Sequence, residues 1–170
     1  VKCPGFEKND VKGILGVKLS LSKFDPAIKD ETNLETSYIH LLAKNKNGWK
    51  NLIKGFSEAN REEFFYKKPR LDFNRLSKYS SDLIAYTGDP RSELANLCFT
   101  NLNVYNSRSY DEAKSFVKDQ SNLKKDLLSA LDKYKQVFKE NLFLGIQTID
   151  AKYFPANMVL TNIFRWASKE

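Results

Sequence analysis

Apolar residues along this chain alternate between short runs of strand length and longer stretches with helical spacing. The short runs predict strands at residues 12–21, 36–43, 82–87 and 142–147. The longer stretches predict helices at residues 47–58, 71–78, 90–99, 110–119, 121–140 and 156–168. Strands separated by helices are typical of the α/β class, so we expect a largely parallel sheet with flanking helices. In the helix at 47–58, we expect one apolar face formed by Trp49, Leu52, Ile53 and Phe56.

Two of the predicted strands end in polar turns that lead into a predicted helix. The strand at 36–43 is followed by Lys44-Asn45, and the strand at 82–87 is followed by Gly88-Asp89-Pro90. The carboxyl ends of parallel strands share one edge of a sheet, where α/β proteins hold their functional sites. We therefore expect both turns to lie at the same edge.

Four stretches of the sequence match, in order, the motifs of one known domain. They read GILGVK at 13–18, LLAKNKNGWKNL at 41–52, DLIAYTGDPRSEL at 82–94 and YKQVFKENLFLGIQ at 134–147. Together they resemble the PHP (polymerase and histidinol phosphatase) domain at the amino end of bacterial C-family replicative polymerases, the DNA polymerase III alpha subunits. The resemblance implies a single PHP-like domain over residues 1–170, in the form of a partial or divergent TIM-like α/β barrel.

The resemblance also implies a metal centre, for which this sequence has few ligands. PHP domains hold a cluster of zinc or manganese ions through His and carboxylate ligands and hydrolyse phosphoesters. Aligned on the motifs, three family ligand positions hold Lys18, Tyr38 and Gly145 here. The remaining candidates are Asp89 and the single histidine, His40. We expect Asp89 to cap a helix and His40 to be structural, so that no metal binds and this region is inactive; a zinc or manganese site at these two residues is the alternative.

Most of the formal net charge of +7 lies in residues 44–75, which contain nine Lys or Arg residues and four acidic ones. Cations beside aromatic residues, as at 64–70, can hold phosphates while the rings stack on bases. We expect DNA contacts from five of these cations: Lys44, Lys46, Lys67, Lys68 and Arg70. A solvated surface without a ligand is the alternative.

Composition limits the other classes of function. With 170 residues and 41% hydrophobic content, the chain is long enough for one globular domain. No apolar stretch approaches the roughly 20 residues of a membrane span, and the first residues lack the apolar core of a signal peptide. Cys3 and Cys98 form no CxxC pair, so we expect free thiols and a cytoplasmic protein. Glycine-rich phosphate-binding motifs and a GxSxG motif are absent from the sequence.

These patterns favour a non-catalytic PHP-type domain with a structural or docking role in DNA replication, from a bacterial or phage polymerase III alpha-like protein. Its expected partners are the rest of the polymerase, a proofreading exonuclease or a sliding clamp, and DNA. The nucleotidyltransferase carboxylates of such a polymerase belong to a different domain. Two alternatives are a metal-dependent 3′–5′ exonuclease or phosphoesterase, and a free-standing phage-type protein that binds a polymerase or clamp.

Overall fold

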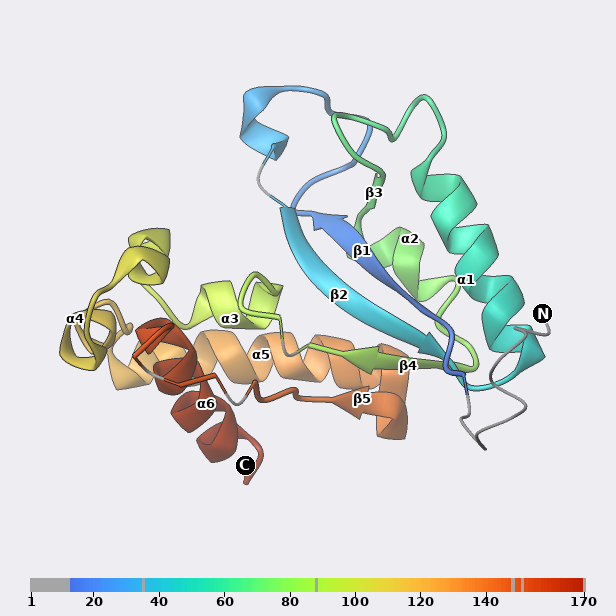
Figure 1. Cartoon of the computed structure of the whole chain (residues 1–170). Coiled ribbons are helices and arrows are strands. Elements are labelled where there is room, and N and C mark those ends of the chain that lie inside the picture. The colour runs from blue at the N-terminus through green and yellow to red at the C-terminus, as the bar shows by residue number, and fades with distance from the viewer. Residues whose placement is uncertain (1–12, 35, 88, 148, 151, 170) are drawn as a thin grey trace.

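A computed structural model of the chain describes residues 13–34, 36–87, 89–147, 149–150 and 152–169. These residues contain a five-stranded sheet in the order β3-β1-β2-β4-β5 (Figure 1). The strands are β1 (Gly16–Ser22), β2 (Thr36–Ala43), β3 (Arg70–Leu71), β4 (Leu83–Tyr86) and β5 (Leu142–Phe143). Flanking helices make the fold α/β, as the sequence predicts.

Four of the five strands run in one direction, and β2 runs in the other. β1 pairs in parallel with β3, and β4 pairs in parallel with β5, whereas β2 is antiparallel to both β1 and β4. The sheet is therefore largely parallel in strand direction but mixed in its pairing. The expectation that the turns after β2 and β4 share one edge is wrong, because the carboxyl ends of antiparallel strands lie at opposite edges.

The described residues also form six α-helices and three short 3₁₀ helices. The α-helices are α1 (Lys46–Ala59), α2 (Phe73–Ser77), α3 (Glu93–Leu97), α4 (Tyr110–Ser115), α5 (Gln120–Phe138) and α6 (Pro155–Ala167). The 3₁₀ helices are η1 (Glu31–Asn33), η2 (Leu102–Asn106) and η3 (Lys139–Asn141). Among the helices of the described residues, none combines the length and the apolarity that a membrane crossing needs.

Side-chain caps fix where most of the α-helices begin. The side chain of Asn45 accepts the N–H groups of Asn47 and Gly48 at the start of α1. Four more caps have the same form: Asp72 for α2, Ser92 for α3, Ser109 for α4 and Asp119 for α5. Each cap satisfies backbone N–H groups that have no partner within the helix. The start of α6 instead has Pro155 in its first turn, where a missing N–H group costs nothing.

The two faces of the sheet differ in polarity. Leu19, Ile39, Leu41, Leu83 and Ala85 alternate along β1, β2 and β4 and are almost fully buried. They belong to one hydrophobic core with residues of α1, α2 and α5, and Figure 1 shows α2 and α5 behind the sheet. The residues between them along the strands point to the other face, which we call the polar face.

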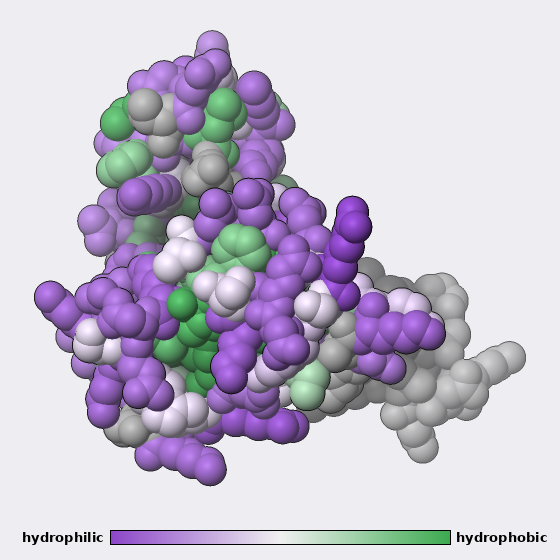
Figure 2. Space-filling view, turned by 90° about the vertical axis from the view of Figure 1, so that its left-hand side faces the viewer, coloured by the Kyte–Doolittle hydropathy of each residue, from purple (hydrophilic) through white to green (hydrophobic). Residues whose placement is uncertain are grey.

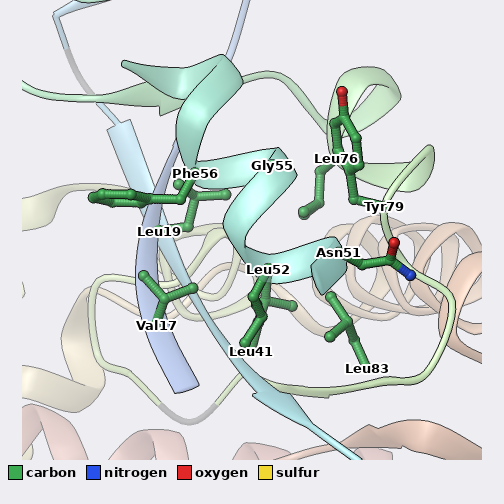
Figure 3. A pocket seen from close by; sticks show the side chains of 10 residues that line it. All are labelled: Val17, Leu19, Leu41, Asn51, Leu52, Gly55, Phe56, Leu76, Tyr79 and Leu83. Atoms are coloured by element: carbon green, nitrogen blue, oxygen red, sulfur yellow. The ribbon is translucent and has the colours of Figure 1, made fainter. Parts of the chain in front are cut away.

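A small cavity of about 10 Å³ lies between α1 and the core side of the sheet (Figure 3). Its lining comes from β1, β2, α1, α2, β4 and the residues near them: Val17, Leu19, Leu41, Asn51, Leu52, Gly55, Phe56, Leu76, Tyr79 and Leu83. A space of this size holds at most one water molecule. It is therefore a packing defect and not a ligand site.

Several predicted elements differ in detail from the structure. β3 is not among the predicted strands: Arg70 belongs to no predicted element, and Leu71 falls in the predicted helix at 71–78. The strand predicted at 142–147 is limited to the two residues of β5, and the helix predicted at 90–99 begins only at Glu93. On α1, Leu52 is buried as expected, but Ile53 and Phe56 are 45% and 44% exposed. The buried face includes Gly48 and Gly55 instead; a Cβ atom at Gly48 would collide with the carbonyl oxygen of Asp82 before β4.

Candidate functional site

A row of polar and aromatic side chains crosses three neighbouring strands on the polar face. The pairing register places Lys18 of β1 directly opposite His40 of β2, and His40 opposite Tyr86 of β4. Directly opposite residues in antiparallel strands point to the same face. The rings of His40 and Tyr86 meet edge to face, with centroids 5.6 Å apart. Residues far apart in the sequence are thus assembled into one site.

Asp89 follows β4 and binds to this row. Its Oδ2 accepts a hydrogen bond from Lys18 Nζ at 2.5 Å and lies 3.3 Å from His40 Nε2. Its Oδ1 accepts the N–H of Arg91 at 2.8 Å. Burial raises the pKa of the Asp89 carboxyl, but the hydrogen bonds from Lys18, Arg91 and His40 outweigh burial and leave the pKa below its ordinary value. Asp89 is therefore a carboxylate that is already paired with a cation.

Tyr38 lies two residues before His40 on the same face of β2 and is surrounded by positive charge. Lys68 Nζ donates to the Tyr38 hydroxyl at 3.2 Å, and Lys18 Nζ lies 4.3 Å from the centroid of the ring. The hydrogen bond from Lys68 lowers the pKa of Tyr38; burial opposes this effect, and the charges of Lys68, Lys18 and Arg91 reinforce it. The net effect is a pKa below the ordinary value of a tyrosine.

Gly145 lies beyond β5, where the ring of Tyr86 covers it. A Cβ atom at Gly145 would overlap the Cε2, Cζ and hydroxyl atoms of Tyr86. Any larger side chain at this position would have to displace the ring. The position where the resemblance implies a glutamate ligand is thus closed by an aromatic side chain.

Comparison with known proteins identifies the family of the chain. Residues 4–149 match the PHP domain family. The chain belongs to the PHP domain family. This result confirms the resemblance that the four sequence motifs indicate.

The relatives of this PHP domain are much longer proteins. It is 33% identical over 146 residues, 81% of the chain, to the DNA polymerase III subunit alpha of Aquifex aeolicus, and covers 10% of that protein. It is 37% identical over 97 residues, 53% of the chain, to the subunit of the same name from Borreliella burgdorferi, and covers 8% of it. It is 27% identical over 143 residues, 82% of the chain, to the DNA polymerase III subunit alpha of Helicobacter pylori, and covers 10% of that protein. The chain thus spans about a tenth of the length of these curated relatives.

The side chains of this PHP domain do not fit the metal cluster that the resemblance implies. Within the described part of the chain, no group of three or more His, Cys, Asp or Glu side chains could hold a metal ion. Lys18 Nζ lies 2.5 Å from Oδ2 of Asp89, and its ammonium group would repel a metal cation at that oxygen. His40 and Asp89 alone are fewer than the three protein ligands typical of a catalytic zinc site.

Asp89 does not have the capping role that we expected. The cap of α3 is Ser92, whose Oγ accepts the N–H of Ala95 at 3.2 Å. Asp89 instead stabilises the turn that precedes α3, through the N–H of Arg91, and uses its second oxygen for Lys18 and His40. Its presence in this cluster follows from strand order, which the local sequence does not show.

The five residues expected to contact DNA do not form one patch. Lys68 reaches Tyr38 near the start of β2, and Lys67 precedes it. Lys44 follows the end of β2, roughly 20 Å further along the strand, where its Nζ donates to Asn141 Oδ1 at 2.8 Å. Lys46 opens α1 at that same end. The two pairs therefore lie at opposite edges of the sheet.

Arg70, the fifth of these cations, is buried inside the fold. It is 1% exposed, and its guanidinium donates to the backbone carbonyl groups of Phe64, Asn33, Pro26 and Ile28. An enclosed guanidinium cannot reach a phosphate, so the expectation for Arg70 is wrong. Sequence reasoning missed instead the cations Lys18 and Arg91 as neighbours of Tyr38, since only the antiparallel pairing of β1 with β2 brings Lys18 there.

Proposed function

We propose that residues 1–170 form a single, non-catalytic PHP domain of a cytoplasmic DNA polymerase III alpha-type replication protein, with a structural and docking role. One observation carries this proposal: the Lys18 ammonium group is bound to Asp89, at the place where the resemblance to the family implies metal ligands. A lysine in that position supplies the positive charge that stabilises the carboxylate. It supplies neither a Lewis acid nor an activated water molecule, which metal-dependent phosphoester hydrolysis requires.

A docking role is supported by apolar side chains that are exposed near the carboxyl end of the chain. Phe143, Ile146, Ile149, Tyr153 and Met158 are 52%, 38%, 43%, 77% and 44% exposed. Figure 2 views the end of the molecule that carries α4 and α6, and shows a small apolar hollow within a mostly hydrophilic surface. Apolar surface that is exposed to solvent is a feature of protein interfaces. We propose the remainder of the polymerase as the partner, because the match covers only 8–10% of the length of these relatives.

The proposal is tested by metal content and nuclease activity measured on the same purified chain. We expect elemental mass spectrometry to find less than one zinc or manganese ion per ten chains, before and after incubation with either metal. We also expect that the chain does not cleave a 3′-labelled single-stranded oligonucleotide when manganese is added. Cleavage that manganese stimulates and EDTA abolishes should not occur.

Two or more tightly bound ions per chain would contradict the proposal. So would metal-dependent cleavage that is lost in the Asp89→Ala variant, because that result would favour the exonuclease or phosphoesterase alternative. A free-standing polymerase-binding protein would differ in a third way. It would come from its source as a short chain that co-purifies with a separate polymerase or clamp.

A further inference from the structure

Positive charge on the polar face exceeds the negative charge that is available to balance it. Lys18, Lys68 and Arg91 all act on the Tyr38 hydroxyl, and Asp89 is bound to Lys18 alone among these three side chains. Within the described residues, no carboxylate lies within ion-pair distance of Lys68 or Arg91. Among the side chains that the structure describes, Lys68 and Arg91 are thus two positive charges beside Tyr38 without an acidic partner.

The geometry makes this excess costly unless an anion joins the cluster. The Nζ atoms of Lys18 and Lys68 lie 4.3 Å and 5.1 Å from the centroid of the same Tyr38 ring. The backbone carbonyl of Arg91 accepts the N–H of Tyr38 at 3.0 Å, which anchors Arg91 beside the start of β2. Neighbouring positive charges repel one another, and an anion that binds to them removes the repulsion.

We propose that Lys68, Arg91 and the Tyr38 hydroxyl bind a phosphate group without any metal ion, with Lys18 held beside them by Asp89. The inference rests on the proposed metal-free state of this face. Arg and Lys are the side chains that bind phosphate oxygens in proteins, the first through paired N–H donors and the second as a point charge. Arg91 is exposed and Lys68 is half-buried, so solvent reaches the site.

Phosphate on this face has two sources in a replication protein: a phosphate group of a DNA strand, or free inorganic phosphate. The shared chemistry is a tetrahedral oxyanion, and Lys67 next to Lys68 would extend the site along a DNA backbone. The two sources differ in one respect. DNA carries further phosphates that Lys67 would contact, whereas inorganic phosphate does not reach beyond the cluster.

The test measures binding of inorganic phosphate by calorimetry, and of a fluorescent oligothymidylate by anisotropy, both with EDTA present throughout. The Lys68→Gln/Arg91→Gln variant should bind at least one of these probes tenfold more weakly than the unmodified chain. The Lys114→Gln/Arg165→Gln variant loses the same charges from exposed positions on α4 and α6. It should stay within twofold of the unmodified chain.

A second variant, Asp89→Asn, should change phosphate affinity in the opposite direction to Lys68→Gln/Arg91→Gln. Asp89→Asn keeps an oxygen that can accept the N–H of Arg91 but removes the only carboxylate of the cluster, so it should strengthen phosphate binding several-fold. When EDTA is replaced by zinc or manganese, a metal-dependent site would instead lose binding in this variant, which separates failure of the proposed function from failure of this inference. Absence of binding to both probes in EDTA, or equal binding by Lys68→Gln/Arg91→Gln and the unmodified chain, would overturn the phosphate site.

Discussion

At the scale of single residues, one lysine determines the chemistry of the polar face. Lys18 is opposite His40 in the β-ladder and binds Asp89 at 2.5 Å. His40 and Asp89 can both bind metal and already lie together. Lys18, the third member of the group, carries a positive charge that opposes a metal cation. The Lys18 side chain is 43% exposed and that of Asp89 is 10% exposed, so replacement at position 18 leaves the hydrophobic core intact.

Exchange of this lysine for a carboxylate should create metal affinity. In Lys18→Glu, the new carboxylate would join His40 and Asp89, which gives the three protein ligands of a typical zinc site. We expect zinc to bind this variant at least tenfold more tightly than the unmodified chain, measured by calorimetry. Lys18→Gln is the control, because it removes the cation without adding a ligand. Equal zinc affinity in all three proteins would show that Lys18 does not block a metal site.

At the scale of elements, Arg70 connects the edge strand β3 to the long loop after β1. Its guanidinium donates at 2.6 Å, 2.9 Å and 2.7 Å to the carbonyl groups of Asn33, Pro26 and Ile28. Asn33 is also fully buried, and its side chain donates to Asp25 and Ile28. A polar network thus replaces an apolar core under this loop and satisfies its buried carbonyl groups.

Removal of the Arg70 guanidinium should therefore destabilise the fold. The Arg70→Met variant leaves several buried carbonyl groups without donors, each of which costs about 1–3 kcal/mol. We expect the free energy of unfolding in urea to fall by about 3 kcal/mol or more, while Arg61→Met changes it by less than about 0.5 kcal/mol. Arg61 is the matched control, since its side chain is 65% exposed and lies 3.8 Å from Glu63 in a surface ion pair. A similar small change in both variants would contradict the structural role of Arg70.

The same element shows where prediction from sequence stops. The helical spacing of α5 and the apolar runs of β2 and β4 are local signals, and the structure has these elements close to the predicted residues. β3 has only two residues, and its pairing with β1 depends on contacts across about 50 positions of sequence. The sequence predicts Arg70 to be a surface cation, because its partners are backbone carbonyl groups. Every residue has such a group, so the sequence does not indicate which of them bind Arg70. The direction of β2 could not be predicted from the sequence either. The cluster of Lys18, Tyr38 and Asp89 depends on that direction, so it could not be predicted.

At the scale of the whole molecule, the separation of the basic residues predicts which edge faces DNA. Lys67 and Lys68 adjoin the cation cluster of the polar face, whereas Lys44 and Lys46 lie at the opposite edge of the sheet. The Lys67→Gln/Lys68→Gln variant should therefore bind oligothymidylate more weakly, and the slope of log affinity against log salt should fall by about 1–2. Lys44→Gln/Lys46→Gln removes the same charge and should keep the slope of the unmodified chain. The opposite ranking would place DNA at the carboxyl end of β2.

Docking to the remainder of the polymerase belongs to the same scale, because it depends on an exposed apolar surface and not on a single site. Phe143 on the edge strand β5 and Tyr153 before α6 are among the most exposed apolar side chains of the described residues. Aromatic side chains in such positions contribute much of the binding energy of protein interfaces. The Phe143→Ser/Tyr153→Ser variant should therefore bind a polymerase that lacks this domain at least tenfold more weakly in surface plasmon resonance. Ile53→Ser/Phe56→Ser on α1 removes comparable exposed apolar groups and should bind like the unmodified chain; if it alone lost binding, the docking surface would be α1.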